Sequence, residues 1–132
     1  MDPINYGYQK KLRGESFDYA IERVTAALKE EGFGILTEID VKDTLKKKLD
    51  VDFHRYMILG ACNPNLAHQA LGAESQIGLL LPCNVVVQET NDGEVVVSIA
   101  DPKAMFAMVN NESLRAVANE ADKRLARVME TL

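Results

Sequence analysis

Apolar residues recur every three or four positions in two long segments, one near each end of the chain. The first set consists of Phe17, Ala20, Ile21, Val24, Ala27 and Leu28. The second consists of Leu114, Val117, Ala118, Ala121, Leu125, Val128, Met129 and Leu132. This spacing places each set on one face of an α-helix. The pattern therefore predicts two long amphipathic helices, with Ser16 as the N-cap of the first and Gly32 as its stop.

Between these helices the pattern changes to alternation and to short apolar runs, which are typical of β-strands. The predicted strands are residues 6–12, 33–40, 56–61, 79–89 and 94–99. The run 56–61 is apolar on both sides and suits the centre of a sheet. Asp92 and Gly93 lie between the last two strands and predict a tight hairpin.

Alternation also predicts which side chains share a face of the sheet. The expected core face carries Phe33, Ile35, Thr37, Ile39, Leu81, Cys83, Val85, Val87, Val95, Val97 and Ile99. The expected second face carries Leu36, Val86 and Val96 together with Glu38, Asn84, Gln88 and Ser98. This mixture is too apolar for bulk solvent and too polar for a core. We therefore expect a symmetry mate or a ligand to cover it.

Three shorter helices are predicted between the strands. The first occupies Val41–Leu49, with Asp40 as its cap. The second begins with Asn63 as N-cap and Pro64 at the first helical position and ends at Gly72. In the third helix, Asp101 is the predicted N-cap and Pro102 occupies the first helical position. Two long helices and several antiparallel strands predict one α+β domain over residues 1–132, with both long helices on one face of an antiparallel sheet.

The composition narrows the functional classes. The 132 residues are 47% hydrophobic and 27% charged, which fits one compact domain. A net charge of −5 argues against binding to nucleic acid. The basic run at residues 46–48 is followed by Asp50 and Asp52, which is typical of a solvated face. No segment approaches the roughly twenty apolar residues of a membrane span, so we expect a cytoplasmic protein that binds neither nucleic acid nor membranes.

Several segments resemble the domain of unknown function 302 family. They are YMILGACNP at residues 56–64, GLLLPCNVVV at residues 78–87, Asp101-Pro102, and the opening that runs from Ser16-Phe17 to Gly32-Phe33-Gly34 and Glu38-Ile39-Asp40. The resemblance covers about Tyr6 to Leu125. It implies a β-α-β(4)-α order similar to one repeat of the TATA-box-binding protein, with short helices inserted, and a homodimer. It implies no assigned reaction, and similarity of fold transfers no DNA-binding function.

The two cysteines are the only chemically unusual feature in a chain without a complete catalytic signature. Cys62 ends a strand just before a helix N-terminus, a position that favours the thiolate. Cys83 alternates in phase with aliphatic neighbours, which is typical of a buried structural cysteine. If strands 56–61 and 79–89 pair antiparallel, both cysteines lie at the same end of the sheet. Cys62, Asn63, Cys83 and Asn84 are therefore candidate ligand-binding residues.

Two further side chains are candidates with strong structural alternatives. His68 lies about one turn beyond Cys62 and forms a conceivable Cys/His pair, although a solvated helical histidine is the commoner case and no metal-binding spacing supports a metal. Glu38 shares a strand face with Asp40, which suggests a carboxylate pair, but such residues are more often an exposed strand side and a helix cap.

The sequence supports three functional hypotheses. The first is a homodimeric domain that binds a small molecule or a metal near the two cysteine motifs, with no cofactor identified. The second is a thiol-dependent enzyme or redox protein that uses Cys62. The third is a purely structural interaction module. The sequence does not decide whether the protein is an enzyme.

Overall fold

The computed structural model describes residues 4–132. The elements follow the order β1 (Gly7–Leu12), α1 (Phe17–Glu30), β2 (Gly34–Asp40), α2 (Val41–Leu49), β3 (Tyr56–Cys62), α3 (Pro64–Ala73), a 3-10 helix η1 (Ser75–Leu80), β4 (Cys83–Glu89), β5 (Val95–Ala100), α4 (Pro102–Phe106) and α5 (Ser113–Thr131). The predicted α+β class is confirmed. The β-α-β(4)-α order holds once α2, α3, η1 and α4 are treated as insertions.

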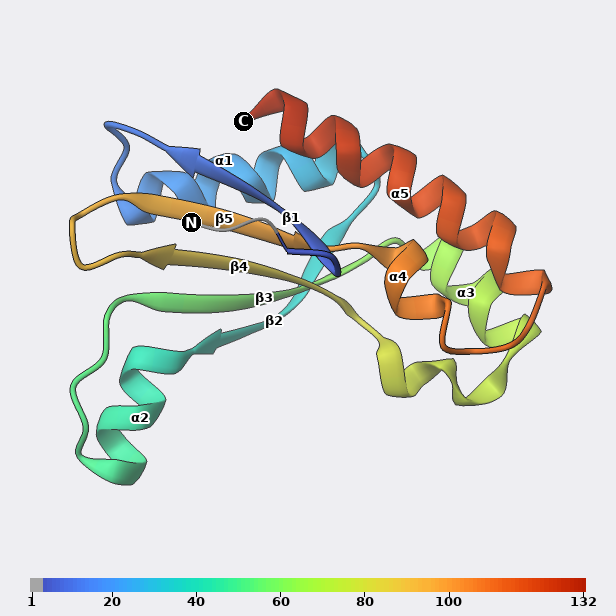
Figure 1. The fold of residues 1–132 in the computed structure, drawn as a ribbon, viewed down its shortest axis with the longest axis horizontal. Helices are drawn as coiled ribbons and strands as arrows, with labels where there is room; N and C mark the ends of the chain where they lie inside the picture. Colours follow the sequence, from blue (N-terminus) through green and yellow to red (C-terminus); the bar gives the residue numbers. More distant parts are fainter. Residues whose placement is uncertain (1–3) are drawn as a thin grey trace.

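The five strands form one open sheet in the order β1-β5-β4-β3-β2, and every neighbouring pair is antiparallel. Figure 1 shows α1 and α5 side by side along the sheet, with α3 and α4 near the N-terminal half of α5 and α2 projecting from the opposite end. Within residues 4–132, no helix combines the length and apolar character that crossing a bilayer requires.

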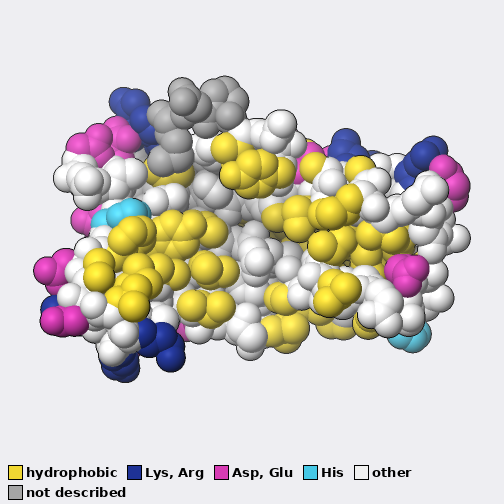
Figure 2. Space-filling model, turned by 60° about the horizontal axis from the view of Figure 1, so that its bottom comes forward, with side chains coloured by type: hydrophobic (Ala, Val, Ile, Leu, Met, Phe, Trp, Pro, Cys, Tyr) yellow, Lys and Arg dark blue, Asp and Glu magenta, His cyan; other side chains and the backbone are white. Residues whose placement is uncertain are grey.

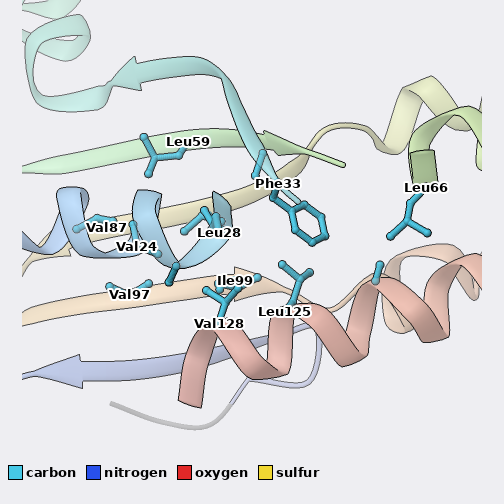
Figure 3. Packing of buried hydrophobic residues seen from close by; sticks show 14 of the residues in the cluster. Val24, Leu28, Phe33, Leu59, Leu66, Val87, Val97, Ile99, Leu125 and Val128 are labelled. Carbon is cyan, nitrogen blue, oxygen red and sulfur yellow. The ribbon is translucent and has the colours of Figure 1, made fainter. Parts of the chain in front are cut away.

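The core lies between the sheet and the two long helices, as the apolar stripes predict. Figure 3 shows side chains of α1 and α5 directed at the inner face of the sheet. The labelled residues are Val24 and Leu28 of α1, Leu125 and Val128 of α5, and Leu59, Val87, Val97 and Ile99 of the strands, with Phe33 and Leu66 beside them. Because the inner face is apolar and its neighbours are buried, this layer supplies most of the hydrophobic stabilisation.

The predicted faces of β2 are wrong beyond Ile35. The pairing of β2 with β3 shifts register between Ile35 and Thr37, which is a β-bulge. Ile35 lies opposite the buried Ala61, but Thr37 lies opposite Gly60 on the outer face. The extra residue reverses the alternation, so Thr37 and Ile39 do not face the core and Ile39 is exposed. Strict alternation fails here because one inserted residue changes the face of every residue that follows it.

Two predicted boundaries are also wrong. The strand expected from residue 79 begins only at Cys83, and the preceding Ser75–Leu80 is a 3-10 helix. The helix expected to end at Gly72 continues to Ala73. Leucines at residues 79–81 made the first segment resemble a strand, although Leu79 itself is highly exposed. The later start makes Cys83 the first residue of β4 instead of an interior one, but it leaves Cys83 opposite the buried Ala61, on the predicted core face.

All three short-helix caps are confirmed. Asp40 Oδ1 accepts from the Asp43 N–H, and Asp101 Oδ1 accepts from the N–H groups of Lys103 and Ala104. Asn63 Oδ1 accepts from the Leu66 N–H at 3.2 Å. Each cap satisfies a backbone donor that the helix itself leaves without a partner.

We predict that Asn63→Ala lowers the free energy of unfolding by about 1–2 kcal/mol, because it removes both a cap and a buried polar contact. Asp101→Ala removes a more exposed cap and should cost about 1 kcal/mol. Urea unfolding followed by circular dichroism measures both. Asn84→Ala, at an exposed position, is the matched control and should change stability by less than about 0.5 kcal/mol. An Asn63 variant as stable as this control would contradict the structural role assigned to the amide.

Candidate ligand-binding site

The candidate site lies where β3 ends and β4 begins. Ala61 of β3 stands opposite Cys83 of β4, so Cys62 and Cys83 lie at the same end of the sheet, as antiparallel pairing requires. Both cysteines are free thiols and both are half-buried. Cys62 stands opposite Gly34 on the other neighbouring strand. The topology thus brings the two sequence motifs together.

Asn63 fixes the end of the sheet where the cysteines meet. It is the one buried polar residue in the described part of the chain, with 6% of its surface exposed. In addition to capping α3, its Nδ2 donates to the carbonyl oxygen of Glu31 at 3.4 Å. Gly32 must be a glycine, because its φ is +85° and a Cβ would lie 2.8 Å from Asn63 Nδ2. Asn63 is therefore a structural residue at the border of the site.

Two adjoining cavities open beside Cys83. The inner one has a volume of about 30 Å³, and its walls combine residues of β3, α3, β4, α4 and α5. The second measures about 120 Å³ and lies beneath η1 and α4. Both cavities are lined by Leu81, Pro82, Cys83, Pro102 and Phe106. Cys83 is therefore the one cysteine that contributes to both cavities, in largely apolar surroundings.

Burial controls the chemistry of Cys83. The pKa of its thiol rises from an ordinary value of 9.0 to about 11, because burial disfavours the thiolate and because a charge on the nearby Cys62 would repel it. At neutral pH only about one molecule in ten thousand then carries a Cys83 thiolate. Cys83 therefore acts as a small apolar wall with a weak S–H donor rather than as a nucleophile.

Of the two remaining candidates on this part of the chain, Asn84 borders a cavity with Cys83 and His68 does not. Asn84 is exposed on the outer face, although it borders the larger of the two cavities. His68 is exposed on α3 and lines neither cavity. In residues 4–132, no three His, Cys, Asp or Glu side chains gather closely enough to hold a metal ion.

The predicted position of Glu38 on the second face is wrong. Glu38 lies opposite Leu59, on the helix-facing side of the sheet, because the β2 bulge reverses the alternation. It stays exposed at the edge strand and borders neither cavity. Asp40, its proposed carboxylate partner, caps α2. The carboxylate pair is therefore replaced by an exposed side chain and a helix cap.

Sequence reasoning missed Phe106 and Pro102, which line both cavities. A signal was present. Because β5 runs antiparallel to β4, its last residues lie beside the first residues of β4, so the helix that follows Asp101 must lie at the cysteine end. Phe106 is the large apolar residue that this short helix buries, with 7% of its surface exposed.

Comparisons with known proteins identify relatives without an assigned activity. The family described as "Domain of unknown function DUF302" matches residues 8–132. A crystal structure of an uncharacterized conserved DUF302 protein from Bacillus stearothermophilus is 31% identical, covers 97% of this chain and 98% of its own, and superposes with a TM-score of 0.88. No curated protein matches the chain.

We predict that Cys62 is alkylated by iodoacetamide several-fold faster than Cys83 at pH 7.5. The reagent attacks the thiolate, and burial suppresses the thiolate of Cys83. Peptide mapping after timed quenching measures both rates in the same sample. The variants Cys62→Ala and Cys83→Ala assign each rate to one thiol. Faster labelling of Cys83 would contradict the burial described here.

We predict that Cys83 makes the folded state less stable in alkaline solution. The raised pKa means that the folded protein holds the Cys83 proton more tightly, so this stabilisation is full below pH 9 and is lost as the pH rises through about 11. The loss should be on the order of 2 kcal/mol and should be absent from Cys83→Ala.

Urea unfolding at pH 8, 9, 10 and 11 tests this difference in slope. Ionisation of Tyr8 changes the stability of the wild type and of Cys83→Ala equally, because the hydrogen bond to Asp122 at 2.6 Å, which raises the pKa of Tyr8 to about 12, does not involve Cys83. Parallel pH profiles for the wild type and Cys83→Ala would show that the thiol is not buried as described.

Proposed function

We propose that this chain, which belongs to the family of the domain of unknown function DUF302, is a homodimeric domain that binds a small, largely apolar molecule beside Cys83. The observation that carries the proposal is the pair of cavities that share Leu81, Pro82, Cys83, Pro102 and Phe106. Concave apolar sites with a few polar groups at their margins are typical of ligand-binding domains. Asn84 and the Cys83 thiol supply such groups here.

The dimensions suit a small ring or a short chain. An apolar cavity of about 150 Å³ in another protein holds a benzene ring, and the larger cysteine-lined cavity is of similar size at about 120 Å³. The inner cavity of about 30 Å³ extends it toward α3 and α5. Displacing poorly held water from such walls favours binding.

A thiol enzyme is the weaker alternative. A dithiol redox pair needs one cysteine that is readily ionised and a second that can resolve the mixed disulfide. Cys83 resists ionisation, so its attack on a mixed disulfide would be slow at neutral pH. Cys62 still lies just before the N-terminus of α3. Its candidate partner His68, however, is exposed to solvent.

The outer face of the sheet supports self-association. On β3, β4 and β5 the outward positions are Tyr56, Ile58, Gly60, Asn84, Val86, Gln88, Val96, Ser98 and Ala100, and none is charged. Figure 2 shows hydrophobic side chains gathered in two areas of one face, with uncharged surface between them and charged groups toward the margins. A face without charge at its centre does not repel a second copy of itself, and interface centres are depleted of charge.

Exposed apolar side chains extend this face at the β2 end of the sheet. Leu36 is 66% exposed, Leu49 is 66% exposed and Ile39 is 47% exposed. Beside them Phe53 stacks on His54 with ring centroids 4.2 Å apart, and His54 Nε2 lies 3.0 Å from Gln88 Oε1. Contiguous exposed apolar surface of this kind marks interaction sites more often than chance.

Native mass spectrometry of freshly purified protein, with sedimentation equilibrium in parallel, tests the proposal. We expect twice the monomer mass of 14.6 kDa, and a bound small molecule or a mass shift on addition of toluene. Ile39→Lys combined with Leu49→Lys should yield monomers, because burying two added charges in an interface is costly. Tyr19→Lys, at an exposed position on α1, is the matched control and should stay dimeric.

The results separate the hypotheses. A clean monomer at micromolar concentration would remove the dimer. A dimer that never takes up toluene or a copurified molecule would leave the structural interaction module, and a covalent adduct on Cys62 would favour the thiol enzyme.

A further inference from the structure

A third and larger cavity lies on the other side of Phe106. It measures about 350 Å³ and lies between α4, the connection at residues 107–112 and the first turns of α5. Phe106 is the single residue that lines this cavity as well as both cysteine-lined cavities. Phe106 therefore borders both this cavity, called the outer chamber, and the two cysteine-lined cavities, called together the inner chamber.

The outer chamber differs from the inner chamber in chemistry. Its walls carry the amides Asn110, Asn111 and Asn119 above an apolar floor that includes Val109 and Leu114. Of these amides, Asn111 is engaged, because Nδ2 donates to the Ala73 carbonyl and Oδ1 accepts from the Ser113 N–H. Asn110 and Asn119 are exposed at the rim. Amide side chains offer both donors and acceptors to a bound molecule.

The charges of the outer chamber are already paired. Lys103 Nζ lies 3.3 Å from Asp122 Oδ2, and Arg115 donates to Glu112 Oε1 at 3.0 Å. Each cation that lines the chamber therefore has its own carboxylate. A phosphate would have to compete with both ion pairs, whereas a hydroxyl or amide group can use the asparagines without displacing either pair.

We propose that Phe106 is the gate of a two-chamber site for an uncharged amphiphile, with its apolar ring or chain beside Cys83 and its hydroxyl or amide head in the outer chamber. This inference rests on the proposed ligand-binding function. The inner cavities of about 30 and 120 Å³ fall below the 300 Å³ or more that is typical of metabolite sites, and the outer cavity of about 350 Å³ lies within that range. Displacement of one ring joins the chambers.

The surrounding backbone permits that displacement. Phe106 ends a helix of only five residues, so few backbone hydrogen bonds hold α4 in place. The connection that follows is held by short turns, such as the bond from the Val109 N–H to the Phe106 carbonyl at 3.0 Å, and by one distant contact, from Asn111 Nδ2 to the Ala73 carbonyl at 2.9 Å. Short elements with few internal bonds open more readily than long helices or central strands.

The gate is tested without any ligand by the rate at which iodoacetamide labels Cys83. Phe106→Ala removes the ring that borders both chambers and should raise the Cys83 rate at least tenfold. Phe17→Ala is the matched control, because Phe17 is equally buried but lines none of the three cavities. Rates are compared at urea concentrations where both variants are more than 99% folded by circular dichroism.

If either alanine variant fails to fold, the milder variants Phe106→Leu and Phe17→Leu replace the pair. We again expect faster Cys83 labelling in the Phe106 variant than in the Phe17 variant. Equal acceleration of Cys83 in the two members of the pair means that general loosening admits the reagent, and the gate is then rejected.

The ligand class is tested with three probes of similar ring size on the wild type. We expect 3-phenylpropanamide to slow Cys83 labelling most, and 3-phenylpropanoate and toluene to slow it less. The amide advantage should be lost in Asn110→Leu combined with Asn119→Leu. Equal protection by all three probes would reject the outer chamber as a head-group site while leaving the proposed function intact. Protection by none would reject the proposed function, although the gate result would stand.

Discussion

The hydrogen bonds of the Asn63 side-chain amide hold together the end of the sheet that carries the two cysteines. Its Oδ1 holds the first turn of α3, and its Nδ2 reaches the Glu31 carbonyl at the end of α1, which Arg124 of α5 also contacts at 3.2 Å. One side chain thereby ties the start of α3 to the end of α1, and Arg124 adds α5. Because Cys62 precedes Asn63 directly, the end of β3 cannot shift without breaking this junction. Buried polar groups that are fully paired make a local structure specific in this way.

The sheet imposes the second constraint, because its two faces meet different surroundings. Both long helices cover the inner face along most of its length, and Leu59, Val85, Val87 and Val97 are completely buried beneath them. At the cysteine end the cover passes to the shorter α3 and α4. The two cysteine-lined cavities lie at this end, with residues of α3, η1 and α4 in their walls. The outer face has uncharged residues along its three central strands, most of them partly exposed, although Val96 is completely buried.

Most of the fold could be predicted from the sequence because its signals are local. Helical stripes, the Asn63-Pro64 and Asp101-Pro102 caps and the Asp92-Gly93 turn each specify backbone geometry within a few residues. The β2 bulge was not predictable, because the register of β2 against β3 appears only in the folded sheet, where Thr37 and Pro82 approach Gly60 so closely that a Cβ there would lie 2.8 Å from Pro82 Cγ. The residues of the cavity walls were not predicted for the same reason, because their neighbours depend on how the strands pair. Phe106 is an ordinary apolar residue until the antiparallel order of β4 and β5 places it beside Cys83.

The two cysteines occupy similar sequence motifs, yet the fold gives them different chemistry. Each lies at a strand terminus close to a proline: Cys62 ends β3 two residues before Pro64, and Cys83 begins β4 directly after Pro82. The alternation of side chains along β3 separates the two cysteines. Cys83 lies opposite Ala61 on the core side, whereas Cys62, the residue after Ala61, alternates to the other side of β3. Burial then holds the Cys83 proton, with a pKa of about 11, against apolar cavity walls. A thiol that stays protonated adds shape and weak polarity but little reactivity, so of the two cysteines Cys83 is the structural one and any thiol chemistry at this end of the sheet falls to Cys62.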